Sequence, residues 1–195
     1  MNVLLSMAAF ALAASISPGP VNLVALSAGA QYGLSASLRH VAGATLGFVA
    51  LFLLIGLGLH AALHRWPFLT AAIQWSGAAF LLYLAYRLAL DDGRLGVERA
   101  AAGPSAWRGA AMQWLNPKAW LASVAGMSAF AANGDTALVW RFAAVYLVVC
   151  YGSVASWAVA GVCLTRYLRD ARRVRLFNRA MAALLAASAF YLLDA

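Results

Sequence analysis

The sequence predicts an all-α membrane protein whose six transmembrane helices form two inverted three-helix repeats, each with a broken first helix. Of its 195 residues, 65% are hydrophobic and only 10% are charged, a composition that is foreign to soluble domains of this size. Six apolar stretches reach the ~20 residues of a membrane crossing: about 2–30, 40–63, 66–90, 108–132, 137–165 and 174–193. We therefore treat residues 1–195 as a single transmembrane domain that itself carries the function.

The first stretch is interrupted at its middle by the segment Ser17-Pro18-Gly19-Pro20, followed by Asn22. A continuous helix would lose backbone hydrogen bonds at both prolines, and hydrocarbon offers no water to replace them. Gly19 can adopt backbone angles closed to other residues, and Pro20 suits the first turn of a new helix. We expect two half-helices meeting near the midplane beside a watery cavity, where transporters bind their substrates. The alternative is a proline kink without a function.

The first crossing is expected to end at Gly33, and the second to begin near His40. Gly43 and Gly47 form a small-xxx-small pair that lets another helix approach closely, and Gly29 repeats this spacing with Gly33. We assign both pairs to packing within the bundle. His40 is expected to be a solvated side chain at the membrane edge, with proton transfer as the alternative role.

The third stretch carries Trp and Tyr residues at both ends, as in the aromatic belt of membrane helices. Residues 91–107 are the longest polar segment and predict a cytoplasmic loop between the two repeats. The fourth stretch is then interrupted by Asn116-Pro117-Lys118. Because Asn is a preferred helix N-cap and Pro a preferred first residue, a second half-helix is expected to begin here.

The two proline breaks divide the chain into similar halves. Pro18 and Pro117 lie 99 positions apart, so that residues 1–90 and 108–195 each contain three predicted crossings with a break in the first. An odd number of crossings turns the second half upside down relative to the first, which is the inverted-repeat plan of many secondary transporters. The new helix N-termini at Pro20 and Pro117 would then both point towards the middle of the bundle.

Lys118 is the only lysine of the chain and lies beside the second break. An ionisable side chain inside a membrane is costly and is functional by default. The alternative is that Lys118 extends its ammonium to the cytoplasmic face. Cys150 and Cys163 lie in one predicted helix roughly 20 Å apart, so they cannot bridge each other, and we expect both to be buried small residues.

Arginines define the topology and account for most of the net charge of +8. Eleven of the thirteen adjoin the segments after the first, third and fifth crossings: Arg39, Arg87, Arg94, Arg99, Arg108, Arg166, Arg169, Arg172, Arg173, Arg175 and Arg179. The positive-inside rule places these segments in the cytoplasm and both termini on the other side. The position of the basic cluster beside a membrane span favours contact with anionic lipid over nucleic acid.

The paired break motifs, together with this length and helix count, resemble the LysE/RhtB family of amino-acid exporters over essentially the whole chain. The resemblance implies a multi-pass protein of the bacterial inner membrane that exports amino acids or close derivatives, coupled to protons. Many members have an acidic residue after the glycine of the second helix, whereas this chain reads Leu46-Gly47-Phe48, so the proton carrier is not assigned. Phe48 and the segment 157–161 are closer to the cysteine and O-acetylserine exporters than to the basic-amino-acid branch.

The leading hypothesis is a secondary exporter of a small neutral or polar amino acid. Its expected partners are the substrate and membrane lipid, and the sequence leaves open whether it forms a homo-oligomer. The half-helix ends and Lys118 would hold the α-carboxylate, and Asn22, Asn116 and freed carbonyls the α-amino group. The candidate binding residues are Ser17, Pro18, Gly19, Pro20, Asn22, Asn116, Pro117 and Lys118. We expect no enzymatic activity, cofactor or nucleic-acid partner. The alternatives are a membrane scaffold or assembly protein and a metal-ion transporter.

Overall fold

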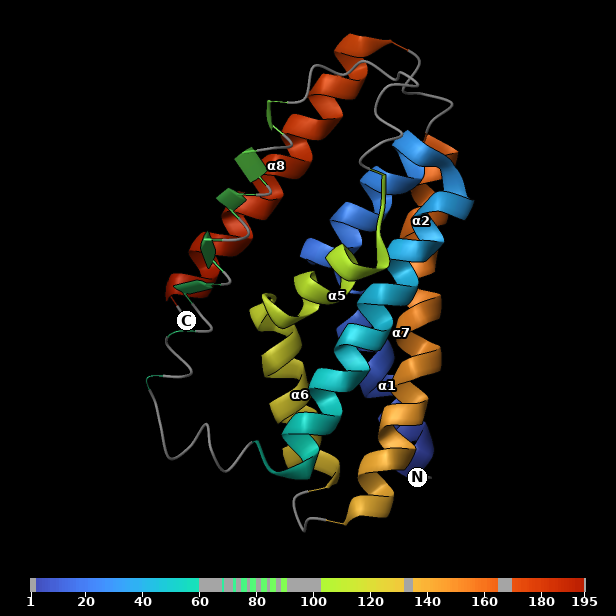
Figure 1. The fold of residues 1–195 in the computed structure, drawn as a ribbon, viewed down its shortest axis with the longest axis vertical. Coiled ribbons are helices and arrows are strands. Elements are labelled where there is room, and N and C mark those ends of the chain that lie inside the picture. The colour runs from blue at the N-terminus through green and yellow to red at the C-terminus, as the bar shows by residue number, and fades with distance from the viewer. Residues whose placement is uncertain are drawn as a thin grey trace.

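The computed structural model describes residues 3–59, 103–131, 135–164 and 170–194, together with isolated positions between residues 68 and 90. These residues are helical and contain no strand, which confirms the all-α prediction. The elements are α1 (Val3–Ile16), α2 (Pro20–Leu54), a π-helical turn η1 (Ile55–Leu59), α5 (Ala106–Trp114), α6 (Pro117–Phe130), α7 (Thr136–Leu164) and α8 (Ala171–Asp194). In Figure 1, α1, α2, α5, α6 and α7 form the bundle, and α8 runs along one side.

Two helical segments of the described chain, Pro20–Gly58 and Thr136–Leu164, are long and apolar enough to cross a membrane, although the first reverses direction at Gly33 and is not one straight helix. Helix α1 is a shorter apolar helix. Large apolar residues face outward from them, such as Leu46, which is 61% exposed, and Val148, which is 72% exposed. Most of the predicted third crossing at 66–90 lies outside the described residues, as does 91–102 of the predicted loop. Helix α5 begins at Ala106, inside the last residues assigned to that loop.

Helix α2 contains a sharp turn at Gly33, where the backbone has φ 76° and ψ 174°. Figure 1 shows that the chain reverses there, so that α2 has a first arm, residues 20–32, and a second arm, residues 34–54. The second crossing therefore begins about six residues earlier than predicted. A Cβ on Gly33 would meet nothing within 4 Å, so this glycine serves the turn and not helix packing.

The other glycines of α2 permit close helix packing, as predicted. A Cβ on Gly29 would overlap the backbone of Ala158 in α7. On the second arm, Gly43 and Gly47 face the backbone of α5 at Ala106 and Ala110 in the same way. Helices that approach this closely gain many dispersion contacts, which is how helices associate where lipid removes the hydrophobic driving force.

The prediction that His40 is a solvated side chain at the membrane edge is wrong. Only 2% of His40 is exposed, and its Nε2 atom has no hydrogen-bond partner within the described part of the chain. The reason is the neighbouring α5, where Gly109 lies directly against the backbone of His40. The second arm thus brings a polar residue into the packed interior, which its position next to Arg39 did not indicate.

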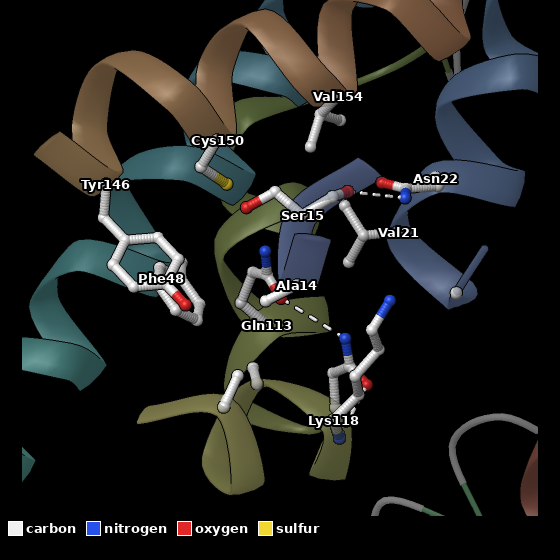
Figure 2. A pocket seen from close by; sticks show the side chains of 14 residues that line it. Ala14, Ser15, Val21, Asn22, Phe48, Gln113, Lys118, Tyr146, Cys150 and Val154 are labelled. Carbon is white, nitrogen blue, oxygen red and sulfur yellow. Dashed lines mark hydrogen bonds between the residues drawn. The ribbon is translucent and has the colours of Figure 1, made fainter. Parts of the chain in front are cut away.

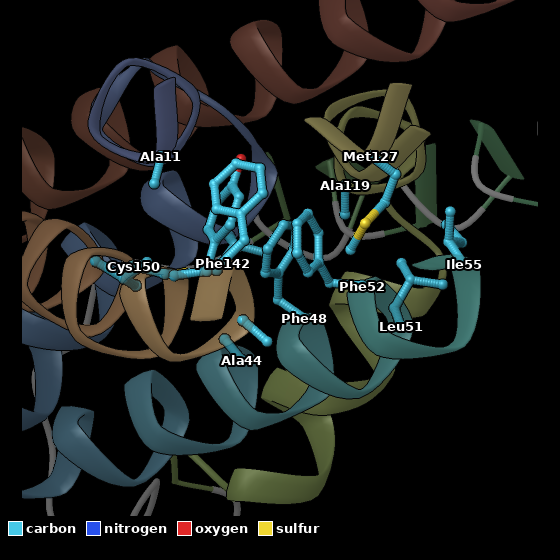
Figure 3. Packing of buried hydrophobic residues seen from close by; sticks show 14 of the residues in the cluster. Ala11, Ala44, Phe48, Leu51, Phe52, Ile55, Ala119, Met127, Phe142 and Cys150 are labelled. Carbon is cyan, nitrogen blue, oxygen red and sulfur yellow. The ribbon is translucent and has the colours of Figure 1, made fainter. Parts of the chain in front are cut away.

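An aromatic cluster fills the space between the second arm of α2 and α7, as Figure 3 shows for part of it. The Tyr146 ring lies 4.7 Å from that of Phe48, 4.8 Å from Phe52 and 5.1 Å from Phe142, measured between ring centroids. Phe52 and Phe142 are in edge contact at 5.0 Å. Such ring pairs add stability beyond the burial of their area, so this cluster holds the two helices in a fixed relation beside the helix breaks.

Candidate functional site

The two predicted breaks meet in space and enclose a small cavity. Helix α1 ends at Ile16 and α2 begins at Pro20, while α5 ends at Trp114 and α6 begins at Pro117. Between them lies a cavity of about 40 Å³, whose polar lining includes Asn22, Asn116 and Lys118 (Figure 2). A volume of this size holds one or a few water molecules, so a substrate must be small or must widen the site as it binds.

Side chains satisfy the carbonyl groups that the first break frees at the end of α1. Asn22 donates from Nδ2 to the carbonyl oxygens of Ser15 at 2.8 Å and of Ser17 at 2.9 Å. Trp157 of α7 donates its indole N–H to the carbonyl oxygen of Ile16 at 3.0 Å. Because these hydrogen bonds give partners to carbonyls that a helix end leaves unpaired, the break is an ordered structure.

Lys118 joins the two breaks across 101 positions of sequence. Its Nζ donates to the carbonyl oxygen of Ser17 at 2.7 Å, to Ser17 Oγ at 2.8 Å and to the carbonyl oxygen of Pro18 at 3.3 Å. The ammonium therefore lies at the first break. In the described part of the chain, no carboxylate lies within ion-pair distance of it, so its positive charge is free to attract an anion.

The second break has the cap that the sequence predicts. Asn116 is the N-cap of α6, its Oδ1 accepts a hydrogen bond from the backbone N–H of Lys118 at 3.2 Å, and Pro117 is the first helical residue. The Asn116 amide also donates to Gln113 Oε1 at 3.3 Å. The helix N-terminus and its partial positive charge are thereby fixed at the cavity.

The N-terminus of α2 faces the same cavity, with Gly19 as its N-cap and Pro20 as its first residue. The backbone of Gly19 is extended, at φ −169° and ψ 172°, so it does not use the angles that only glycine can adopt. Glycine instead gives room to Lys118, because a Cβ would lie in tight contact, 3.3 Å from both its Cδ and its Nζ. No side chain caps this helix end, which leaves its first N–H groups available.

Of the eight predicted residues, Gly19, Asn22, Asn116 and Lys118 line the cavity directly. Ser17 and Pro18 hold the Lys118 ammonium, while Pro20 and Pro117 are buried and start the two helices. The sequence analysis missed the remaining wall, formed mainly by Ser15, Phe48, Gln113, Tyr146, Cys150 and Val154.

Helix α7 supplies three of the missed residues from a single face. Tyr146, Cys150 and Val154 are four residues apart, so they stack along one side of the helix. Had one of these three residues been known to face the breaks, the four-residue spacing would have identified the other two. Cys150 is buried at the cavity, whereas Cys163 is exposed, which contradicts the expectation that both cysteines are buried.

In the residues that the structure describes, the protein is helical, with apolar spans and a cavity between two broken helices, an arrangement that helical membrane transporters use. Residues 12–195 match the family model described as LysE type translocator, and the chain belongs to this family of translocators, as the resemblance predicted. It is 31% identical over 165 residues to the cysteine/O-acetylserine efflux protein of Escherichia coli K12, covering 83% of each chain. The protein of that name in Salmonella typhimurium LT2 is also 31% identical, over 164 residues. No solved structure matches the chain.

Proposed function

We propose that this protein is a multi-pass secondary transporter of the bacterial inner membrane that exports a small amino acid or derivative from the cytoplasm, coupled to protons. The observation that carries the proposal is the meeting of Lys118 with the N-termini of α2 and α6 at one cavity. The family and the efflux function for which its relatives are named support it. Because those relatives are named for cysteine and O-acetylserine, amino acids of this size are the first substrates to test.

The cavity can recognise the charged groups that all α-amino acids share. A carboxylate at the cavity would accept hydrogen bonds from two sources of positive charge, the Lys118 ammonium and the free N–H groups at the start of α2 (Figure 2). The ammonium now donates to Ser17 and Pro18, so its shift towards a carboxylate would release these carbonyls. A substrate ammonium could then bind the released carbonyls, which matches the two opposite charges of the substrate.

The proposal includes six crossings built as two inverted repeats. In Figure 1 the first arm of α2 and α6 run in opposite directions, as two related half-helices in inverted repeats would do. The arginines after the first, third and fifth predicted crossings would then face the cytoplasm. Alternating access follows if one repeat rocks against the other around the cavity.

Transport by the purified protein in liposomes tests this function. Vesicles loaded with a panel of unlabelled amino acids should take up labelled cysteine or O-acetylserine by exchange, and an imposed pH gradient should drive net movement. Amino-acid amides, which lack the carboxylate, should compete only weakly. A scaffold protein would exchange no amino acid, and a metal-ion transporter would move a divalent cation instead.

A further inference from the structure

Tyr146 carries a hydroxyl group that is buried at the cavity without a partner. Only 1% of Tyr146 is exposed, and its hydroxyl makes no hydrogen bond within the part of the chain that the structure describes. The same residue is part of the cavity wall. Because burial of an unpaired hydroxyl is unfavourable, phenylalanine would fill this position better if packing were the only role of the side chain.

The tyrosine ring cannot turn away to find a partner elsewhere. Rings of Phe48, Phe52 and Phe142 surround it with centroid distances of 4.7, 4.8 and 5.1 Å. A different orientation of Tyr146 would break up this packed cluster. The protein therefore holds the hydroxyl in place beside the cavity, as expected for a group that bonds a ligand.

The cavity has two chemically different ends. Figure 2 shows Lys118 and the start of α6 on one side, and Tyr146 with Phe48 on the other. Cys150, one helical turn from Tyr146, lies at the second end with Ser15 opposite its thiol (Figure 2). Among the described residues, no charged side chain lines this second end, so it suits a neutral group.

We infer, on the basis of the proposed function, that the second end is the subsite for the substrate side chain. Tyr146 hydrogen-bonds an oxygen or sulfur atom near the tip of that side chain, while Phe48 and Val154 limit its length. The class of substrate is then a neutral α-amino acid with a short polar side chain, such as a thiol, hydroxyl or ester. Apolar side chains of the same shape are rejected because they leave the hydroxyl unpaired.

Competition in liposomes tests the role of the hydroxyl. Unlabelled cysteine, O-acetylserine and 2-aminobutyrate, which has a methyl group in place of the thiol, compete with the labelled amino acid that the wild type exchanges. Tyr146→Phe keeps the ring and should lower the affinity for cysteine and for O-acetylserine by about three- to tenfold, the typical effect of one hydrogen bond. The affinity for 2-aminobutyrate should stay within about twofold. Tyr151→Phe, an exposed tyrosine on the same helix, is the matched control and should change nothing.

Alkylation of Cys150 gives a second measurement that does not depend on transport. In a Cys163→Ser background, O-acetylserine should protect Cys150 from N-ethylmaleimide, and Tyr146→Phe should raise the protecting concentration by the same three- to tenfold. If Tyr146→Phe lowers the affinity for all three competitors equally, or leaves competition and protection unchanged, the side-chain subsite at Tyr146 is refuted. A wild type that exchanges no amino acid would instead overturn the proposed function.

Discussion

Replacement of Lys118 by methionine is the most direct test of carboxylate recognition, because it keeps the length of the side chain and removes its charge. The ammonium makes three hydrogen bonds, to the carbonyl and hydroxyl oxygens of Ser17 and to the carbonyl of Pro18. If a substrate carboxylate takes one of these donors, the variant loses a charged hydrogen bond worth ~1.5–3 kcal/mol. We expect the substrate affinity to fall by roughly ten- to a hundredfold.

The assay measures substrate affinity by competition in liposomes that contain equal amounts of folded protein. Arg141→Met removes one positive charge from an exposed position of α7 and is the matched control. Lys118→Arg should restore little, because a planar guanidinium does not fit where a compact ammonium donates in three directions.

Removal of the ammonium also leaves the carbonyls of Ser17 and Pro18 without this donor, so a general loss of stability has to be distinguished from a loss of binding. An amino-acid amide provides the distinction, since it offers no carboxylate. Its weak competition should be the same in wild type and Lys118→Met. Near-normal affinity of Lys118→Met for the amino acid itself would refute the reasoning and remove Lys118 from the site.

Three further predictions concern the break, the topology and the packing. Replacing residues 18–20 with alanine should let α1 and α2 fuse and should abolish export while the protein still inserts; normal export would reduce the break to a tolerated kink. An alkaline phosphatase fused after Ala195 should be active, because the C-terminus is predicted to lie outside the cytoplasm. A fluorescent protein fused there that folds in the cytoplasm would show that the predicted topology is wrong. Gly161→Val should lower the midpoint of thermal unfolding in detergent, because its Cβ would overlap the backbone of Leu26, whereas Gly152→Val meets nothing within 4 Å. Equal unfolding midpoints for the two variants would contradict the close packing of Gly161 against Leu26.

The helix breaks could be predicted from the sequence because their causes are local. Proline removes a backbone donor wherever it stands, and asparagine before proline caps a helix through its own side chain. Both half-helices at Pro20 and Pro117 therefore begin at the predicted residues. The limits of the fifth crossing also followed from its apolar composition, since α7 spans Thr136–Leu164.

The start of the second crossing could not be predicted in this way. Residues 34–39 contain serines and Arg39 and were assigned to a loop, yet they form the beginning of the second arm. Ser37 donates to the carbonyl of Gly33 at 2.7 Å, which satisfies its hydroxyl inside the helix. The burial of His40 depends on α5, which comes more than sixty residues later in the chain.

What the sequence by itself determined is thus the set of features with local causes: an apolar helical protein, two breaks and one lysine beside the second of them. Only the tertiary structure decided that Lys118 crosses to Ser17 and that Tyr146 and Cys150 face the cavity. Helix α7 is apolar on all sides, so no polar face marks the side that turns inward. That choice depends on where glycines such as Gly29 and Gly161 let the backbones approach, which is a property of two helices together.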